Sequence, residues 1–192
     1  TWTRGLLEFD GDSLVNQYEE VGTALKAHKN SNPGNDFVRV GYMDFDKSGN
    51  LWMTNYESNT PLVVKKTDGT WESYPLPGGI GKAVYFLIDD FDQKWIVIPG
   101  LGVVVYSKDM SQSILLNNTA GTGNIHNTTI QCISKDRDGV VWIGTPEGPT
   151  AFYNPSGIFN SLEINAQRVK IDKNQFDNFV DYLLEDQSIN DI

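Results

Sequence analysis

The sequence is poor in cysteine and contains no long apolar segment. The single cysteine, Cys132, excludes an internal disulfide, and its place in an apolar run predicts a small buried thiol. Cysteine content therefore gives no indication of the cellular compartment. No uninterrupted apolar stretch approaches the ~20 residues that a membrane-spanning helix needs, so we expect no direct membrane span.

Positive charge is also scarce. Lys and Arg number 15 against 25 Asp and Glu, and the net charge of −10 argues against nucleic acid as a partner. Aromatic residues are plentiful: 5 Trp, 8 Tyr and 9 Phe, within a chain that is 39% hydrophobic, exclude a disordered acidic tail. By length alone, 192 residues correspond to about one domain.

Residues at recognised catalytic spacings are missing. His28 and His126 lie in different polar loops without neighbouring metal ligands, so we expect both to be solvated. No serine occupies a nucleophile elbow, and no pair of carboxylates is singled out by its spacing. The stretch 121–123 lacks the lysine of a phosphate loop and is interpreted as a turn. We therefore predict no catalytic, cofactor-binding or metal-binding residue, no cofactor and no enzymatic activity; the ligand-binding residues remain unknown.

One segment resembles the start of a calcium-binding loop. Oxygen-bearing side chains alternate from Asp44, and Gly49 stands at the sixth position. The twelfth position is Asn55, which cannot supply the bidentate carboxylate that such loops use. We interpret the segment as a structural turn.

A repeat dominates the rest of the sequence. Trp52, Trp95 and Trp142 lie 43 and 47 residues apart, and an Asp stands six residues before each of them. Apolar spacing recurs upstream of each Trp, and a second strand-like run follows it. Those runs are residues 61–64, 102–106 and 150–153.

The repeated phrase describes a tight turn followed by a strand. Asp, Ser and Asn side chains bond their own backbone, and Gly accepts the positive φ of a tight hairpin. The Trp supplies a flat surface that can pack between neighbouring sheets. A period of about 40–50 residues that is mostly strand is typical of a blade of a β-propeller, so we predict an all-β propeller fold.

The spacing predicts about four blades, three of them full and two partial. The chain then starts and ends inside blades and would be a segment of a larger propeller; the alternative is a four-bladed ring in which residues 189–192 pair with the first strands. The predicted segments are 1–37 (the end of one blade and a connecting loop), 38–82, 83–128 and 129–188 (full blades, the last with a long insertion) and 189–192 (the start of the next blade).

Two regions between the predicted strands are less regular. Residues 14–30 are compatible with a short helix or an irregular excursion, because Gly22 interrupts the helical spacing. The extra length of the third repeat lies in residues 154–188, and insertions on a blade face commonly carry binding sites. Aromatic residues in loops or polar edges could stack on sugars or on a partner, or could pack between blades. They are Tyr56, Trp71, Tyr74, Phe176, Phe179 and Tyr182.

The repeats resemble those of bacterial two-component-regulator propellers, whose blades carry Asp-x-x-Gly-x-x-Trp followed by Ile-Gly-Thr. The third copy, residues 136–145, matches this pattern in full, whereas the first two have drifted after the Trp. Residues 148–155 and 181–184 give a narrower resemblance to PorZ-like propellers, which are associated with type IX secretion.

The resemblance implies an extracytoplasmic location, in the periplasm or at the outer cell surface. It implies a non-catalytic module that binds cell-surface polysaccharide, lipopolysaccharide, an envelope protein or a secretion-system partner, besides the rest of its own propeller. One alternative is a ligand-sensing segment of a hybrid two-component sensor kinase that detects oligosaccharides. A second is a carbohydrate-active enzyme with a propeller fold. The matching motifs are blade signatures, so the resemblance assigns no ligand-contacting residue.

Overall fold

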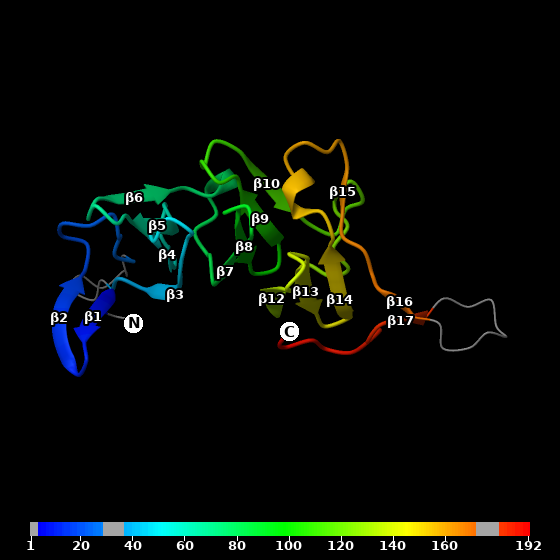
Figure 1. Ribbon diagram of the computed structural model, residues 1–192, viewed down its shortest axis with the longest axis horizontal. Coiled ribbons are helices and arrows are strands. Elements are labelled where there is room, and N and C mark those ends of the chain that lie inside the picture. Colours follow the sequence, from blue (N-terminus) through cyan, green and yellow to red (C-terminus); the bar gives the residue numbers. More distant parts are fainter. Residues whose placement is uncertain (1–3, 29–36, 172–180) are drawn as a thin grey trace. The chain divides into compact units, whose positions relative to one another are not determined.

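The computed structural model describes residues 4–28, 37–171 and 181–192, and it is all-β (Figure 1). The chain divides into two compact units, Thr1–Phe86 and Leu87–Ile192. Apart from one two-stranded parallel sheet in the second unit, the short sheets of both units pair consecutive strands with each other. The only helical segments among the described residues are two three-residue 3-10 turns, Pro77–Gly79 and Pro155–Gly157.

The first unit contains a hairpin and a four-stranded sheet. The hairpin consists of β1 (Leu6–Asp10) and β2 (Ser13–Tyr18). The sheet has the order β3-β4-β5-β6. Its strands are β3 (Val40–Phe45), β4 (Leu51–Asn55), β5 (Leu62–Lys65) and β6 (Trp71–Tyr74).

The hairpin corrects one of the two interpretations of residues 14–30. A helix is wrong there, because Gly11 adopts a φ of +55° in the preceding turn and lets residues 13–18 pair with β1. Gly22, with a φ of +79°, lies in the irregular segment that follows.

The second unit contains one four-stranded and one three-stranded sheet. The first has the order β10-β9-β8-β7, and the second the order β12-β13-β14. The strands are β7 (Phe86–Ile88), β8 (Lys94–Ile98), β9 (Gly102–Tyr106), β10 (Ser113–Leu116), β12 (Cys132–Lys135), β13 (Val141–Thr145) and β14 (Gly148–Phe152). The blade boundaries predicted above remain a prediction.

Short strands in the second unit join segments that are distant in the sequence. β11 (Thr122–Gly123) pairs in parallel with β15 (Ile164–Asn165), and β16 (Lys170–Ile171) pairs antiparallel with β17 (Asp181–Tyr182). The interpretation of residues 121–123 as a turn is therefore wrong in part. The insertion of the third repeat brings β15 alongside, and it supplies hydrogen-bond partners that local sequence does not reveal.

The repeated Asp has one role in all three copies. One carboxylate oxygen of Asp46 accepts the backbone N–H groups of Ser48 and Asn50, both at 2.9 Å. Its other oxygen accepts the indole Nε1–H of Trp52 at 2.9 Å. Asp89 and Trp95 repeat this bond at 2.9 Å, as do Asp136 and Trp142. The structural-turn interpretation is confirmed, and the indole bond explains the constant spacing of six residues.

The three repeat tryptophans differ in burial. Trp95 is fully buried and its ring centroid lies 5.2 Å from that of Phe152 in the neighbouring sheet. Trp52 is also buried and stacks on Tyr74 of its own sheet, with 5.8 Å between centroids. Trp142 is only half-buried, and its ring meets that of the exposed Tyr153 edge-on. The predicted burial of the repeat Trp between sheets is thus confirmed for Trp95, whereas Trp142 is only half-buried.

Cys132 lies at the edge of the three-stranded sheet, beside the C-terminal segment. It is half-buried rather than fully buried, and its thiol donates to the backbone oxygen of Ile189 at 3.4 Å. Burial raises the pKa of this thiol. The backbone N–H of Ile189 in turn donates to the oxygen of Thr145 at 3.1 Å, so residues around 189 lie against β12 and β13.

Candidate ligand-binding site

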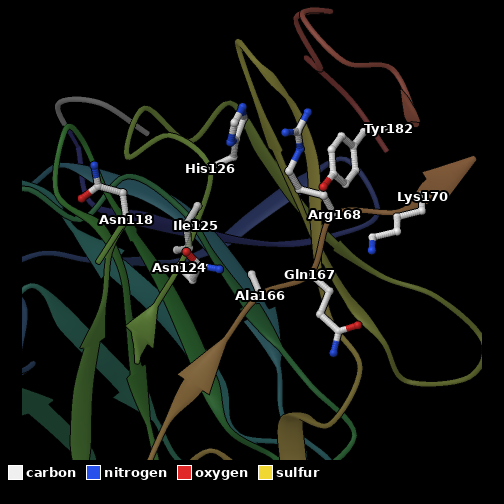
Figure 2. Close-up of a pocket in the computed structure, with 9 residues that line it drawn as sticks. All are labelled: Asn118, Asn124, Ile125, His126, Ala166, Gln167, Arg168, Lys170 and Tyr182. Atoms are coloured by element: carbon white, nitrogen blue, oxygen red, sulfur yellow. The ribbon is translucent and has the colours of Figure 1, made fainter. Parts of the chain in front are cut away.

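A polar pocket of about 440 Å³ opens in the second unit, where the segment after β10 meets the segment after β15 (Figure 2). Two backbone bonds hold these segments together: Ile164 N–H donates to Gly121 O at 2.9 Å, and Ala166 N–H donates to Gly123 O at 2.6 Å. The lining residues are Asn118, Asn124, Ile125, His126, Ala166, Gln167, Arg168, Lys170 and Tyr182.

Gly123 allows the close backbone approach on which this corner depends. It has a φ of +124°, and a Cβ there would lie 2.6 Å from both the N and the O of Asn117. Any other residue would force the segment before the pocket outward. On the other side, Gln167 exchanges two backbone hydrogen bonds with Ala151 of β14, at 2.9 and 2.8 Å. Both walls of the pocket are therefore fixed to sheets.

The pocket combines a small apolar base with amide side chains. Ile125 and Ala166 are buried, whereas Asn118, Asn124 and Gln167 are exposed. An amide side chain both donates and accepts hydrogen bonds. This mixture suits a ligand that carries many hydroxyl groups.

Positive charge gathers in this pocket although the chain is acidic. The Arg168 guanidinium lies 3.9 Å from the centroid of the Tyr182 ring, a cation–π contact, and Figure 2 shows the two side chains together with Lys170 nearby. Arg168 also donates to Glu185 at 2.8 Å, and this hydrogen bond lowers the pKa of the Glu185 carboxyl. Within the described part of the chain, no Asp or Glu lines the pocket.

The histidine of the pocket is not simply solvated. Nε2 of His126 lies 3.4 Å from a carboxylate oxygen of Glu147, and the imidazole is about 29% exposed. His28 in the first unit similarly lies 3.5 Å from Glu57. The expectation of solvated loop histidines is wrong for both, because each packs beside a glutamate from a turn that follows a repeat Trp. No group of three or more potential metal ligands occurs in the described ranges.

The expected exposed aromatics separate into two kinds. Tyr182 lines the pocket, whereas Trp71 packs on Tyr18 at 5.4 Å between centroids and Tyr74 stacks on Trp52. Tyr56 is half-buried.

Phe176 and Phe179 lie outside the described residues.

The pocket residues contributed by the third repeat fall in its long insertion, which the sequence had indicated as a place for binding. Asn118 and Asn124 carried no such signal.

Comparison with known proteins agrees with the fold. Residues 124–147 match the family model of the two component regulator propeller. PorZ of Porphyromonas gingivalis, a surface component of the type IX secretion system, is similar with a TM-score of 0.78 and 24% identity over 99% of this chain and 27% of its own.

Two extracellular domains from B. thetaiotaomicron are also similar. That of BT4673, described as a one component system, has a TM-score of 0.57 and 15% identity over 90% of this chain and 20% of its own. That of BT3049, described as a hybrid two component system, has a TM-score of 0.53 and 18% identity over 74% of this chain and 18% of its own. No curated protein sequence matches the chain.

These observations define the class of protein. The chain is a β-propeller segment that carries a two component regulator propeller repeat, as the sequence predicted. Its fold is similar to that of PorZ and of the extracellular domains of BT3049 and BT4673. The chain spans 27% of the PorZ chain, 18% of the BT3049 chain and 20% of the BT4673 chain. The described residues contain no helix long and apolar enough to cross a membrane.

Proposed function

We propose that the chain is a non-catalytic, extracytoplasmic binding module that holds an acidic cell-surface polysaccharide, such as that of a lipopolysaccharide, in the pocket around Arg168, Lys170 and Tyr182. The observation that carries the proposal is the concentration of cationic and amide side chains, without a lining carboxylate, in a chain of net charge −10. The surface and extracellular origins of the similar structures support the location.

The chemistry of the pocket fits a charged sugar better than a protein or a neutral ligand. Arg168 and Lys170 supply charge-assisted hydrogen bonds to carboxylate or phosphate groups. The exposed amides pair with hydroxyl groups, and the Tyr182 ring offers a flat amphipathic surface. Because Arg168 is already oriented by Glu185 and Tyr182, its guanidinium loses little freedom when a ligand binds.

The proposal is tested by retention of the protein on immobilised polysaccharides, acidic and neutral, including purified lipopolysaccharide. We expect Lys170→Ala to weaken retention on acidic polysaccharide. Lys47 is an exposed lysine in the β3–β4 turn, outside the pocket. Lys47→Ala removes the same charge as Lys170→Ala and should leave retention unchanged. Equal retention on unrelated glycans, or an equal effect of both substitutions, would contradict the proposal.

A sensor function is the second candidate, favoured by the similarity to the extracellular domain of BT3049. It predicts that the gene continues into a membrane helix and kinase domains. A following β-sandwich domain without a membrane helix would count against the sensor. A carbohydrate-active enzyme predicts turnover that one carboxylate substitution abolishes, and a negative result across polysaccharide substrates would retire it.

A further inference from the structure

We propose a second saccharide site in the first unit, centred on His28 and Glu57, that takes an uncharged, polyhydroxylated sugar unit. This inference rests on the proposed polysaccharide-binding function and extends it to a second kind of sugar. The site is a pocket of about 510 Å³ whose lining includes Glu20, Lys26, His28, Glu57, Ser58 and Thr60.

Glu57 has an unusual backbone conformation. Its φ is +58°, in the left-handed region that favours glycine. It stands five residues after Trp52, and the residue five after Trp95 is Gly100, with a φ of +73°. The turn can therefore be made with glycine, as the middle repeat does. In the first repeat a glutamate occupies this position against the backbone preference, and such strained positions cluster at functional sites.

The Glu57 carboxylate is held in place by two neighbouring side chains. Arg39 donates to Glu57 from one side, and Nδ1 of His28 lies 3.5 Å from the same carboxylate oxygen. All three side chains are about one-quarter exposed, so the group is anchored and still accessible. The backbone N–H of Glu57 donates to Gly81 O at 2.8 Å, which fixes the turn.

The segment that carries His28 is fixed by a buried amide. Asn55 accepts from Lys26 N–H at 2.6 Å and donates to Lys26 O at 3.0 Å. Asn55 is fully buried at the end of β4, so it aligns residues 26–28 with the turn that holds Glu57. The pocket wall is thus built by paired polar groups rather than by a loose loop.

A histidine–glutamate pair occurs twice in the molecule, each time with the glutamate at the same position of the repeat. Glu147 stands five residues after Trp142, as Glu57 stands five after Trp52. Glu147 contacts His126 at 3.4 Å, and His126 lines the first pocket. A histidine–glutamate pair therefore borders a pocket where the glutamate stands five residues after Trp52 or Trp142, whereas Gly100 takes this position after Trp95.

The ligand class follows from the balance of charge. Glu20 and Lys26 both line the pocket with 4.0 Å between their charged atoms, and Arg39 balances Glu57. Hydroxyl and amide groups of Ser58, Asn59 and Thr60 complete the lining. A pocket with matched acceptors and donors fits the adjacent hydroxyl groups of a neutral sugar, whereas the first pocket contains Lys170, which no carboxylate of its lining balances.

The test uses a bacterial glycan microarray with neutral and acidic polysaccharides, followed by calorimetric titration of the strongest neutral glycan. Glu57→Gly removes the carboxylate and installs the residue that the backbone favours, so the fold should be retained. Glu57→Gln keeps the shape and removes the charge. We expect both variants to bind the neutral glycan about tenfold more weakly or worse, through loss of hydrogen bonds to a charged acceptor. Lys170→Ala should leave this binding unchanged.

The outcomes separate the two proposals. Neutral signals lost only in the Glu57 variants support the second site. Neutral binding that is unchanged in both variants, or a wild-type protein that binds acidic glycans alone, overturns it while leaving the first site intact. Neutral signals lost in Lys170→Ala and retained in the Glu57 variants would also overturn it. A protein that binds no glycan on the array contradicts the proposed function and the second site together.

Discussion

Replacement of Trp95 by phenylalanine tests the hydrogen bond that defines the repeat. The Trp95 side chain is fully buried, and its Nε1–H donates to the buried carboxylate of Asp89 at 2.9 Å. Phenylalanine keeps a ring that can contact Phe152 and removes this donor. A hydrogen bond to a charged group contributes about 1.5–3 kcal/mol, and the smaller ring leaves a cavity. The acceptor oxygen keeps its bond to Gln93 at 2.6 Å, so it is not orphaned.

We therefore expect Trp95→Phe to lower the free energy of unfolding by about 2–4 kcal/mol, and Trp95→Ala by about 3–5 kcal/mol. Urea unfolding followed by far-ultraviolet circular dichroism measures this without relying on tryptophan fluorescence, which the substitution changes. Trp142→Phe is the matched control: the same atoms are removed from a half-buried ring, and the effect should be clearly smaller. An unchanged midpoint for Trp95→Phe, or equal effects at both positions, would refute the reasoning.

Two further predictions concern the turn and the C-terminal contact. Burial opposes ionisation of Asp46, but hydrogen-bond donors from Trp52 and the backbone outweigh this effect and leave the pKa of Asp46 lowered. The ionised form of Asp46 therefore stabilises the fold above about pH 4, the usual pKa of an Asp in an unfolded chain. This stabilisation is lost as the pH falls through the lower pKa of the folded state. Asp46→Asn should flatten the dependence of the unfolding midpoint on pH in that acidic range, and an unaltered pH profile would contradict this. A Cβ at Gly144 would lie 2.4 Å from the Cys132 thiol and 2.7 Å from Ile189 O. Gly144→Ala should therefore displace the C-terminal segment and speed hydrogen exchange of the Ile189 amide. Unchanged exchange would show that this contact is not tight.

Much of the architecture could be predicted from the sequence because it is local and repeated. The Asp and Trp of each copy, with Gly49, Asp92 and Gly139 between them, mark a turn and the strand that follows, and those elements lie where the repeat indicated. The role of the indole N–H could not be predicted, because the pattern alone does not show which donor the Asp side chain accepts. The half-burial of Trp142 also depends on tertiary contacts that a repeated motif does not contain.

The candidate site was predicted only in part. The long insertion of the third repeat indicated where binding residues would lie, and Tyr182 was among the aromatics singled out. Arg168 and Lys170 gave no signal as single residues. They meet Asn118 and Asn124 because β11 and β15, each two residues long, pair in parallel across the insertion. Strands that short have no periodicity to detect, so the pocket becomes visible only in three dimensions.

We propose above that the pocket around Arg168, Lys170 and Tyr182 holds an acidic polysaccharide. Amide chemical-shift mapping with an acidic oligosaccharide released from lipopolysaccharide tests it most directly. The account predicts that the largest shifts fall on residues 124–126 and 166–170, weaken as salt is added, and disappear in Lys170→Ala but not in Lys47→Ala. Saturable shifts confined to other residues, or shifts that Lys170→Ala leaves unchanged, would contradict it.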